Sequence, residues 1–197
     1  MDDPTASDFP RAGPHPALQG PGRAAPFPAR RAVAMLPGSM RLSELFRAED
    51  LLVGFRPADK WDAIHKLVEH LVTQGRLPRA QAAAIQEAVV ARERSMSTGM
   101  EQGIAIPHAA VDGVETVVAC MGIVGLDSGL SFDSIDGKPT RVVVLLVIPR
   151  AQKLLHIRTL ADIARVLGTE AVREALVRSA DAKEAWGALA EGDAARR

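Results

Sequence analysis

The sequence has little cysteine, no long apolar run and no excess of either charge. One cysteine, Cys120, occurs among the 197 residues, which excludes an intramolecular disulfide and any zinc or iron–sulfur site that needs several cysteines. Basic and acidic side chains number 24 each, so the chain lacks the surplus of Lys and Arg with which nucleic-acid binders displace counterions. The longest apolar run, 142–149, has the length of a strand rather than the roughly 20 residues that cross a bilayer. These absences predict a soluble, cytoplasmic protein that neither binds nucleic acid nor inserts into a membrane.

The composition changes near residue 40. Residues 1–38 hold eight of the 13 prolines, and a segment with so little apolar surface cannot offset the entropy lost on ordering. We therefore expect a disordered, Pro-rich N-terminal extension over 1–38 and a folded domain over 39–192. The extension is either a solvated tail or a docking arm, and Met35 or Met40 is an alternative natural start.

Helical and strand patterns alternate in the folded part. Apolar residues recur every three or four positions in 58–74, which predicts an amphipathic helix that ends at Gly75. A second helix is predicted over about 79–94, with Ile85 and Val89 facing inward, and a loop over 95–99.

Two uncharged runs rich in valine, 117–124 and 142–148, predict central strands buried on both faces. After residue 149 the helical spacing returns, in a stripe that begins with His156, and two shorter helices complete the chain. Helices on both sides of a small sheet define the expected fold class, a compact α/β sandwich.

Two of the five histidines stand out. His108 ends the apolar stretch 104–108, in which Pro107 fixes its own φ and pushes Ile106 into an extended conformation. The proline thereby directs His108 from a rigid strand end, where it is either structural or an exposed reactive group. His156 lies near a helix N-terminus, where the helix dipole favours anions, and is either an edge residue of the core or part of a site.

The residues before His108 have the chemistry of an anion site. Arg92 lies at the end of the second predicted helix, and Thr98 lies in a loop rich in hydroxyl groups and backbone N–H donors. Together such groups cradle a tetrahedral dianion. The sequence offers no cluster of side chains that would hold a metal.

The run from Arg92 to His108, RERSMSTGMEQGIAIPH, resembles the active-site signature of the enzyme IIA domains of the mannitol/fructose type (type 2). These domains belong to the phosphoenolpyruvate-dependent sugar phosphotransferase system. The stretches 132–139 and 156–161 are similar too, and the three segments together most resemble the nitrogen-regulatory branch, enzyme IIA-Ntr. The resemblance covers about residues 40–190 and implies a mixed central β-sheet flanked by helices.

The resemblance implies that His108 accepts a phosphoryl group from an HPr-like phosphocarrier protein. It places the family's second histidine at His156, its phosphate-neighbouring arginine at Arg92 and its hydroxyl at Thr98, and it implies no cofactor or metal. A neutral imidazole is nucleophilic near pH 7 and holds phosphate in a reversible P–N bond. Phosphoryl transfer depends mainly on positioning and charge stabilisation. We expect Arg92 to neutralise the phosphoryl oxygens and Thr98 to donate a hydrogen bond. We expect His156 to orient His108 or to share a proton with the phosphate.

Glu101 departs from the family pattern, which usually has a small residue at this position. If the backbone has a positive φ here, a glutamate is strained, and a carboxylate close to a phosphohistidine disfavours phosphorylation.

Three functions follow from these residues. The leading hypothesis is a phosphoryl-accepting protein of the nitrogen-regulatory type, whose phosphorylation at His108 controls regulatory target proteins. The second is a fructose or mannitol IIA that passes phosphate to a separate IIB permease domain. The third, suggested by Glu101, is a regulatory binding module that has kept the fold and lost phosphotransfer.

Overall fold

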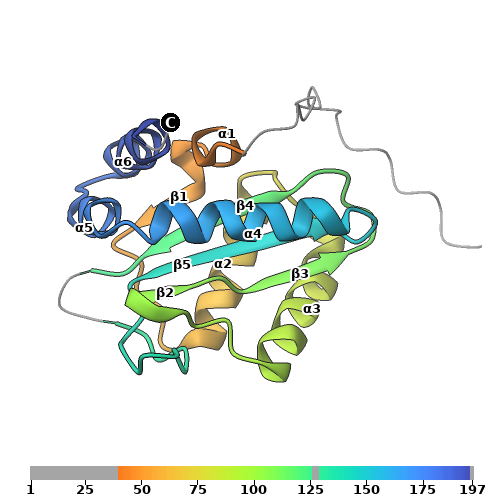
Figure 1. Cartoon of the computed structure of the whole chain (residues 1–197). Helices are drawn as coiled ribbons and strands as arrows, with labels where there is room; N and C mark the ends of the chain where they lie inside the picture. Colours follow the sequence, from red (N-terminus) through yellow and green to blue (C-terminus); the bar gives the residue numbers. More distant parts are fainter. Residues whose placement is uncertain (1–39, 126–128, 196–197) are drawn as a thin grey trace, which may run out of the picture. The chain divides into compact units, whose positions relative to one another are not determined.

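The computed structural model describes residues 40–125 and 129–195 (Figure 1). The extension expected over 1–38 lies outside the described residues. Within the described ranges, no helix combines the length and the apolar character needed to cross a membrane.

The first long helix, α2 (Lys60–Thr73), lies where the apolar periodicity predicts it. Asp59 caps its N-terminus by accepting hydrogen bonds from the N–H groups of Trp61 and Asp62, at 2.8 Å each. These two bonds satisfy donors that have no partner within the first turn of a helix. Just past the other end Gly75 has φ +64°, which a residue without a Cβ adopts at little cost.

The second helix, α3 (Ala82–Ser95), follows a 3₁₀ turn at Arg79–Gln81, so helical structure covers the predicted segment. Ile85 and Val89 are buried, as predicted. Glu93, four residues further along the same face, is buried as well, because residues four apart on a helix share one side. The inner face of α3 therefore ends on a carboxylate.

The sheet that the structure describes is mixed, as expected, and both predicted central strands are buried along their whole length. Its strands are β1 (Leu51–Val53), β2 (Ile104–Ala105), β3 (His108–Val111), β4 (Val118–Ile123) and β5 (Val142–Pro149). β4 and β5 pair antiparallel at the centre. β1 runs parallel to β4 on one side, and β2 and β3 both run parallel to β5 on the other.

β2 and β3 form one line along β5 that is interrupted at Pro107. Ile104 pairs with Val142 and His108 pairs with Leu146. The two pairs are separated by four positions on both sides, so the register is unchanged across the break. Proline has no N–H for the ladder, but its carbonyl still accepts a hydrogen bond of 3.0 Å from the N–H of Leu146. The interruption thus places His108 at a strand start whose position is fixed by β5.

The faces of the sheet are covered by two groups of helices (Figure 1). α2 and α3 pack on one face, with the side chains of Val143, Leu145 and Val147. On the other face pack α1 (Leu42–Leu45), α4 (Lys153–Leu167), α5 (Glu170–Arg178) and α6 (Ala182–Ala194). The alternation along β5 sends neighbouring side chains to opposite faces. This is the expected α/β sandwich, and it brings the C-terminal end of α3 and the N-terminal end of α4 to the same edge strand, β3.

Leu146→Ala tests this packing. Leu146 is fully buried in the core between the sheet and α4, so we expect the substitution to lower the free energy of unfolding by about 2–5 kcal/mol. Leu154→Ala is the matched control, because the Leu154 side chain is 60% exposed and its loss should change stability by about 0.5 kcal/mol or less. Urea unfolding followed by circular dichroism measures both. Equal losses in the two variants would contradict the assigned core.

Candidate active site

His108 is held in one tautomer by its own strand. Its Nδ1 lies 2.7 Å from the carbonyl oxygen of Ile106. A carbonyl oxygen only accepts hydrogen bonds, so Nδ1 carries the proton and Nε2 carries the free lone pair. The local geometry follows from Pro107, since the extended conformation that it imposes on Ile106 turns this carbonyl toward the ring.

His108 is less exposed than the sequence suggests, because only 8% of its surface is accessible. The low exposure arises because α4 places a second ring against the first, which a local sequence pattern cannot reveal. Among the described residues, buried side-chain nitrogens without a hydrogen-bond partner include Nε2 of His156 but not Nε2 of His108.

His156 lies in the first turns of α4 and packs against His108. The centroids of the two rings are 5.1 Å apart and the rings are inclined at 72°, an edge-to-face arrangement. Such a geometry directs the edge of one ring at the face of the other. The pairing brings together two histidines that are 48 positions apart in the sequence.

Arg92 supplies positive charge to both rings from the last turn of α3. Its Nη1 donates a hydrogen bond of 2.8 Å to the carbonyl oxygen of Met96, which holds the guanidinium beside the loop that follows the helix. Its charge is close enough to lower the pKa of His108 and of His156. The structure therefore gathers Arg92, His108 and His156 into one site.

Burial is the largest cause of the low pKa of both histidines, since an apolar environment disfavours the charged imidazolium. For His108 the hydrogen bond to Ile106 and the charge of Glu93 raise the pKa, while Arg92 and His156 lower it, and the net direction is downward. His108 is thus neutral near pH 7, which is the protonation state that a nucleophile needs.

Thr98 lies in the same loop, and its hydroxyl is already engaged. The hydroxyl donates to Oε2 of Glu93 at 2.5 Å, and the N–H of Thr98 donates to the same oxygen at 3.0 Å. A hydroxyl has one proton, so Thr98 donates to a phosphate only after giving up its bond to Glu93. This arrangement differs from the expected role of Thr98 as a ready hydrogen-bond donor.

Glu93 is a functional candidate that the sequence analysis did not identify. Its side chain is completely buried and contacts Ser97, Thr98 and Lys60. The spacing of Ile85 and Val89 carries the signal, because the next position on that inward face is Glu93. A charged residue at a position predicted to be buried marks either an ion pair or a site.

Glu101 does not have the strain that its position suggested. It is exposed, and the left-handed conformation belongs to its neighbours Gln102, with φ 66°, and Gly103, with φ 76°. The charged groups that shift the pKa of His108 are Arg92, His156 and Glu93. The two reasons for suspecting a lost activity at Glu101 are therefore absent from this geometry.

The loop at 96–99 is fixed against the segment that leads to β5. Ser97 donates a hydrogen bond to the carbonyl oxygen of Phe132. A Cβ added to Gly99 would lie only 2.3 Å from that same oxygen, so the close approach requires glycine. The loop is thereby held against the backbone at Phe132.

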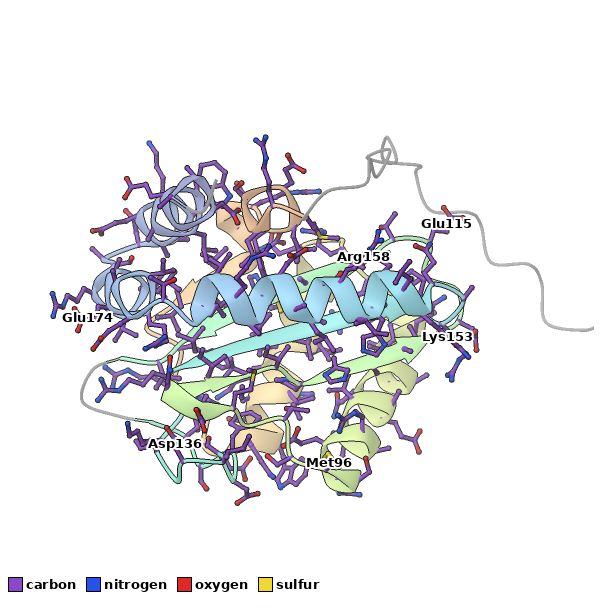
Figure 2. All side chains as sticks on the ribbon, in the orientation of Figure 1. Met96, Glu115, Asp136, Lys153, Arg158 and Glu174 are labelled. Atoms are coloured by element: carbon purple, nitrogen blue, oxygen red, sulfur yellow. The ribbon has the colours of Figure 1, made fainter. Side chains whose placement is uncertain are left out.

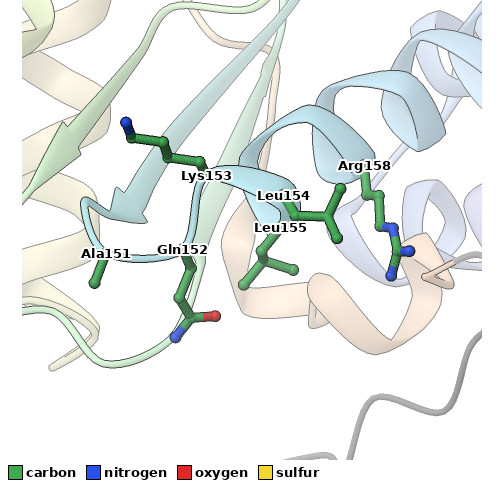
Figure 3. Close-up of a pocket in the computed structure, with 6 residues that line it drawn as sticks. All are labelled: Ala151, Gln152, Lys153, Leu154, Leu155 and Arg158. Carbon is green, nitrogen blue, oxygen red and sulfur yellow. The ribbon is translucent and has the colours of Figure 1, made fainter.

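The surface near the site has exposed apolar side chains. One of them is Met96, which is 69% exposed at the lower end of α3 (Figure 2). In the same view Lys153 marks the start of α4, at the right-hand end of that helix. A groove of about 480 Å³ runs along the start of α4, lined by Leu154, Leu155, Arg158 and their neighbours (Figure 3). None of the predicted site residues lines it.

Comparison with known proteins identifies the family. Residues 44–192 match the family model "Phosphoenolpyruvate-dependent sugar phosphotransferase system, EIIA 2". A nitrogen regulatory protein of Pseudomonas aeruginosa is 38% identical over 109 residues, which cover 55% of this chain and 69% of that protein. A fructose-specific EIIA component of Haloferax volcanii is 34% identical over 137 residues, which cover 68% of this chain and 85% of that protein.

The solved structures agree with the sequence comparison. The crystal structure of the nitrogen regulatory protein IIA-Ntr from Neisseria meningitidis superimposes with a TM-score of 0.67 at 25% identity, over 75% of this chain and 98% of that one. The chain belongs to the EIIA type 2 family of the phosphotransferase system. Its relatives include both nitrogen regulatory proteins and sugar-specific IIA components.

The low pKa of His108 predicts a dependence of stability on pH. The folded-state pKa lies below the ordinary value, so between the two values the unfolded chain binds more protons than the folded chain. The free energy of unfolding should therefore fall as the pH is lowered through and below about 6.5. His108→Asn, which cannot take up this proton, should show a smaller fall over the same range. Urea unfolding at a series of pH values measures both, and parallel curves would contradict the assignment.

Proposed function

We propose that this chain is a phosphoryl-accepting protein of the phosphotransferase system, reversibly phosphorylated on Nε2 of His108 by an HPr-like carrier. The proposal assigns the activity to a domain over 39–192. The single observation that carries it is the hydrogen bond from Nδ1 of His108 to the carbonyl of Ile106. This bond leaves Nε2 unprotonated, so the lone pair of this nitrogen is free to attack a phosphoryl group.

The charges around His108 support transfer in a defined way. In a loose phosphoryl-transfer transition state the negative charge is spread over the equatorial oxygens. We assign the stabilisation of this charge to Arg92, whose guanidinium acts electrostatically on both histidines. Nε2 of His156 has no partner within the described part of the chain, and we assign it a hydrogen bond to the bound phosphoryl group. That bond would satisfy a buried polar atom that is otherwise costly.

The reaction balances without any further reagent. The P–N bond of the carrier's phosphohistidine breaks as the lone pair on Nε2 of His108 forms the new P–N bond. Because Nδ1 keeps its proton and its bond to Ile106, the His108 ring becomes a positively charged imidazolium as Nε2 forms the new bond. The carrier's phosphohistidine, protonated on its second ring nitrogen, gives up the phosphoryl group and leaves as a neutral imidazole, so the total charge is conserved. The two bonds are of the same kind, so the transfer is reversible, as a relay requires.

Members of this family interact with HPr-type carriers and with IIB domains in general. We assign partner docking to the surface beside the site, where Met96, Leu154 and Ile157 are more than half exposed. Apolar side chains of this kind provide contact area in protein interfaces.

Regulation is the leading role, because a nitrogen regulatory protein is 38% identical to this chain over 109 residues. A sugar-specific role is the second candidate, since the fructose-specific component is similar over a larger share of this chain. In that case a separate IIB domain takes the phosphate from His108. The remaining hypothesis, a binding module without phosphotransfer, loses its motivation with the unstrained, exposed Glu101.

Phosphoenolpyruvate, enzyme I and an HPr-like carrier test the proposal directly. We expect the wild-type protein to gain one acid-labile phosphoryl group, and His108→Ala to gain none. In His156→Ala the rate of labelling should fall about tenfold or more, because the hydrogen bond that we assign between His156 and the phosphoryl group is lost. His65→Ala is the matched control and should behave as wild type, since His65 is exposed on α2 and bonds Gln86. Mass spectrometry at neutral pH follows all four proteins.

Full labelling of His108→Ala would overturn the proposal. A labelled protein that passes its phosphate to a IIB domain with productive sugar phosphorylation supports the transport role. Phosphorylation-dependent binding of a regulatory target, with no transfer to IIB, supports the regulatory role.

A further inference from the structure

Glu93 is a carboxylate that the fold buries beside the site. Its side chain is 0% exposed, and a buried carboxylate needs several partners to offset the loss of water. Oε2 accepts hydrogen bonds from the N–H and the hydroxyl of Thr98, while Oε1 lies 3.3 Å from Oγ of Ser97 and 3.5 Å from Nζ of Lys60. Both oxygens are therefore engaged, chiefly with the loop that follows α3.

A continuous series of hydrogen bonds connects this carboxylate to His108. The N–H of Thr98 donates to Glu93 at 3.0 Å. The carbonyl of Thr98 accepts from the N–H of Ile106 at 3.2 Å. The carbonyl of Ile106 accepts from Nδ1 of His108 at 2.7 Å. The carbonyl that fixes the tautomer of His108 thus belongs to a residue whose own N–H is held by the loop that Glu93 anchors.

We propose that Glu93 is a positioning residue for phosphoryl uptake, which fixes the tautomer and orientation of His108 through Thr98 and Ile106. The inference rests on the proposed function for its role in transfer, while its structural half concerns the unphosphorylated protein alone. Glu93 itself touches neither His108 nor, in this account, the phosphoryl group. It keeps the Ile106 carbonyl where the ring needs it, and it occupies the hydroxyl of Thr98 until a phosphate competes for it.

Lys60 explains why a charged carboxylate is tolerated at this depth. Its Nζ lies 2.7 Å from Asp133 and 3.5 Å from Glu93. Although burial lowers the pKa of Lys60, the Asp133 and Glu93 carboxylates raise it, and the net direction is upward. A charged ammonium therefore balances Glu93 and also connects α2, α3 and the segment before β5. The charge on Glu93 adds to the basicity of His108, because it favours the imidazolium.

Glu93→Gln tests the proposal, because the amide has the same shape and lacks the charge. An amide carries a single oxygen, so it cannot keep both the Thr98 and the Lys60 contacts. We expect the rate of phosphoryl uptake from the carrier to fall about tenfold or more, with the KM for the carrier unchanged, since a fully buried residue does not touch it. Glu87→Gln is the matched control, because Glu87 is exposed on the same helix and should behave as wild type.

Nitrogen-15 NMR of the unphosphorylated protein supplies a readout that a merely stabilising residue would not move. In wild-type protein we expect the Nδ1–H tautomer of His108 to dominate. In Glu93→Gln the second tautomer should become populated and the His108 pKa should fall, because a negative charge is lost and the Ile106 hydrogen bond is weakened. Glu93→Asp keeps the charge but shortens the reach, and should give an intermediate result. It also serves as the test variant if Glu93→Gln does not fold.

The outcomes separate the two proposals. A wild-type tautomer, His108 pKa and uptake rate in a folded Glu93 variant would overturn the positioning role and leave the proposed function intact. A wild-type protein that takes up no phosphate would overturn the proposed function, and the NMR comparison would still decide whether Glu93 positions His108. An altered tautomer with a lower uptake rate supports both.

Discussion

The site depends on one short hydrogen bond, in which Nδ1 of His108 donates to the carbonyl of Ile106 two residues earlier. The two residues that form the bond are close in sequence, but its geometry also depends on a distant strand. Pro107 prevents the ladder from continuing and so opens the strand between β2 and β3, while β5 holds both halves in a single register. A proline in the middle of a paired segment is usually a disadvantage. Here it turns a backbone carbonyl toward a side chain that needs a fixed tautomer.

The surrounding elements supply what the strand alone cannot. The last turn of α3 contributes Arg92 and Glu93, which are neighbours in sequence and act in opposite senses on the pKa of His108. The first turns of α4 contribute His156, whose ring packs at 5.1 Å against His108. Burial, assisted by the charge of Arg92, lowers the pKa of His108 and favours the neutral imidazole, while Glu93 acts in the opposite direction. Arg92 also brings positive charge to both histidines, and this is the group to which we assign the stabilisation of the phosphoryl oxygens.

The sequence predicts the scaffold well because its signals are local. The periodicity of α2 and the uncharged runs of β4 and β5 each appear within a single short window, and the structure confirms them. Elements such as β1 (Leu51–Val53) are not predicted, since three residues are too few to show a period. The residues of the site are identified partly through a family resemblance, because local patterns leave His108 and His156 open between structural and functional roles.

What the sequence could not show is the consequence of distant contacts. The low exposure of His108 arises from α4, and the hydroxyl of Thr98 is directed by a carboxylate buried five positions earlier. The sequence does not single out Glu93, because Arg92, Glu93 and Arg94 together have the pattern of a solvent-exposed helix end. The sequence also overstates the backbone strain at Glu101. The left-handed conformation falls on the adjacent Gln102, and a difference of one position is visible only in the structure.

The most direct measurement is NMR spectroscopy of the protein labelled with nitrogen-15 in its histidines and phosphorylated through the carrier. A phosphorus–nitrogen coupling identifies which ring nitrogen forms the new bond. This account predicts that the coupling involves Nε2 of His108 and that Nδ1 keeps its proton. A phosphoryl group on Nδ1 of His108, or on any other histidine, would contradict it.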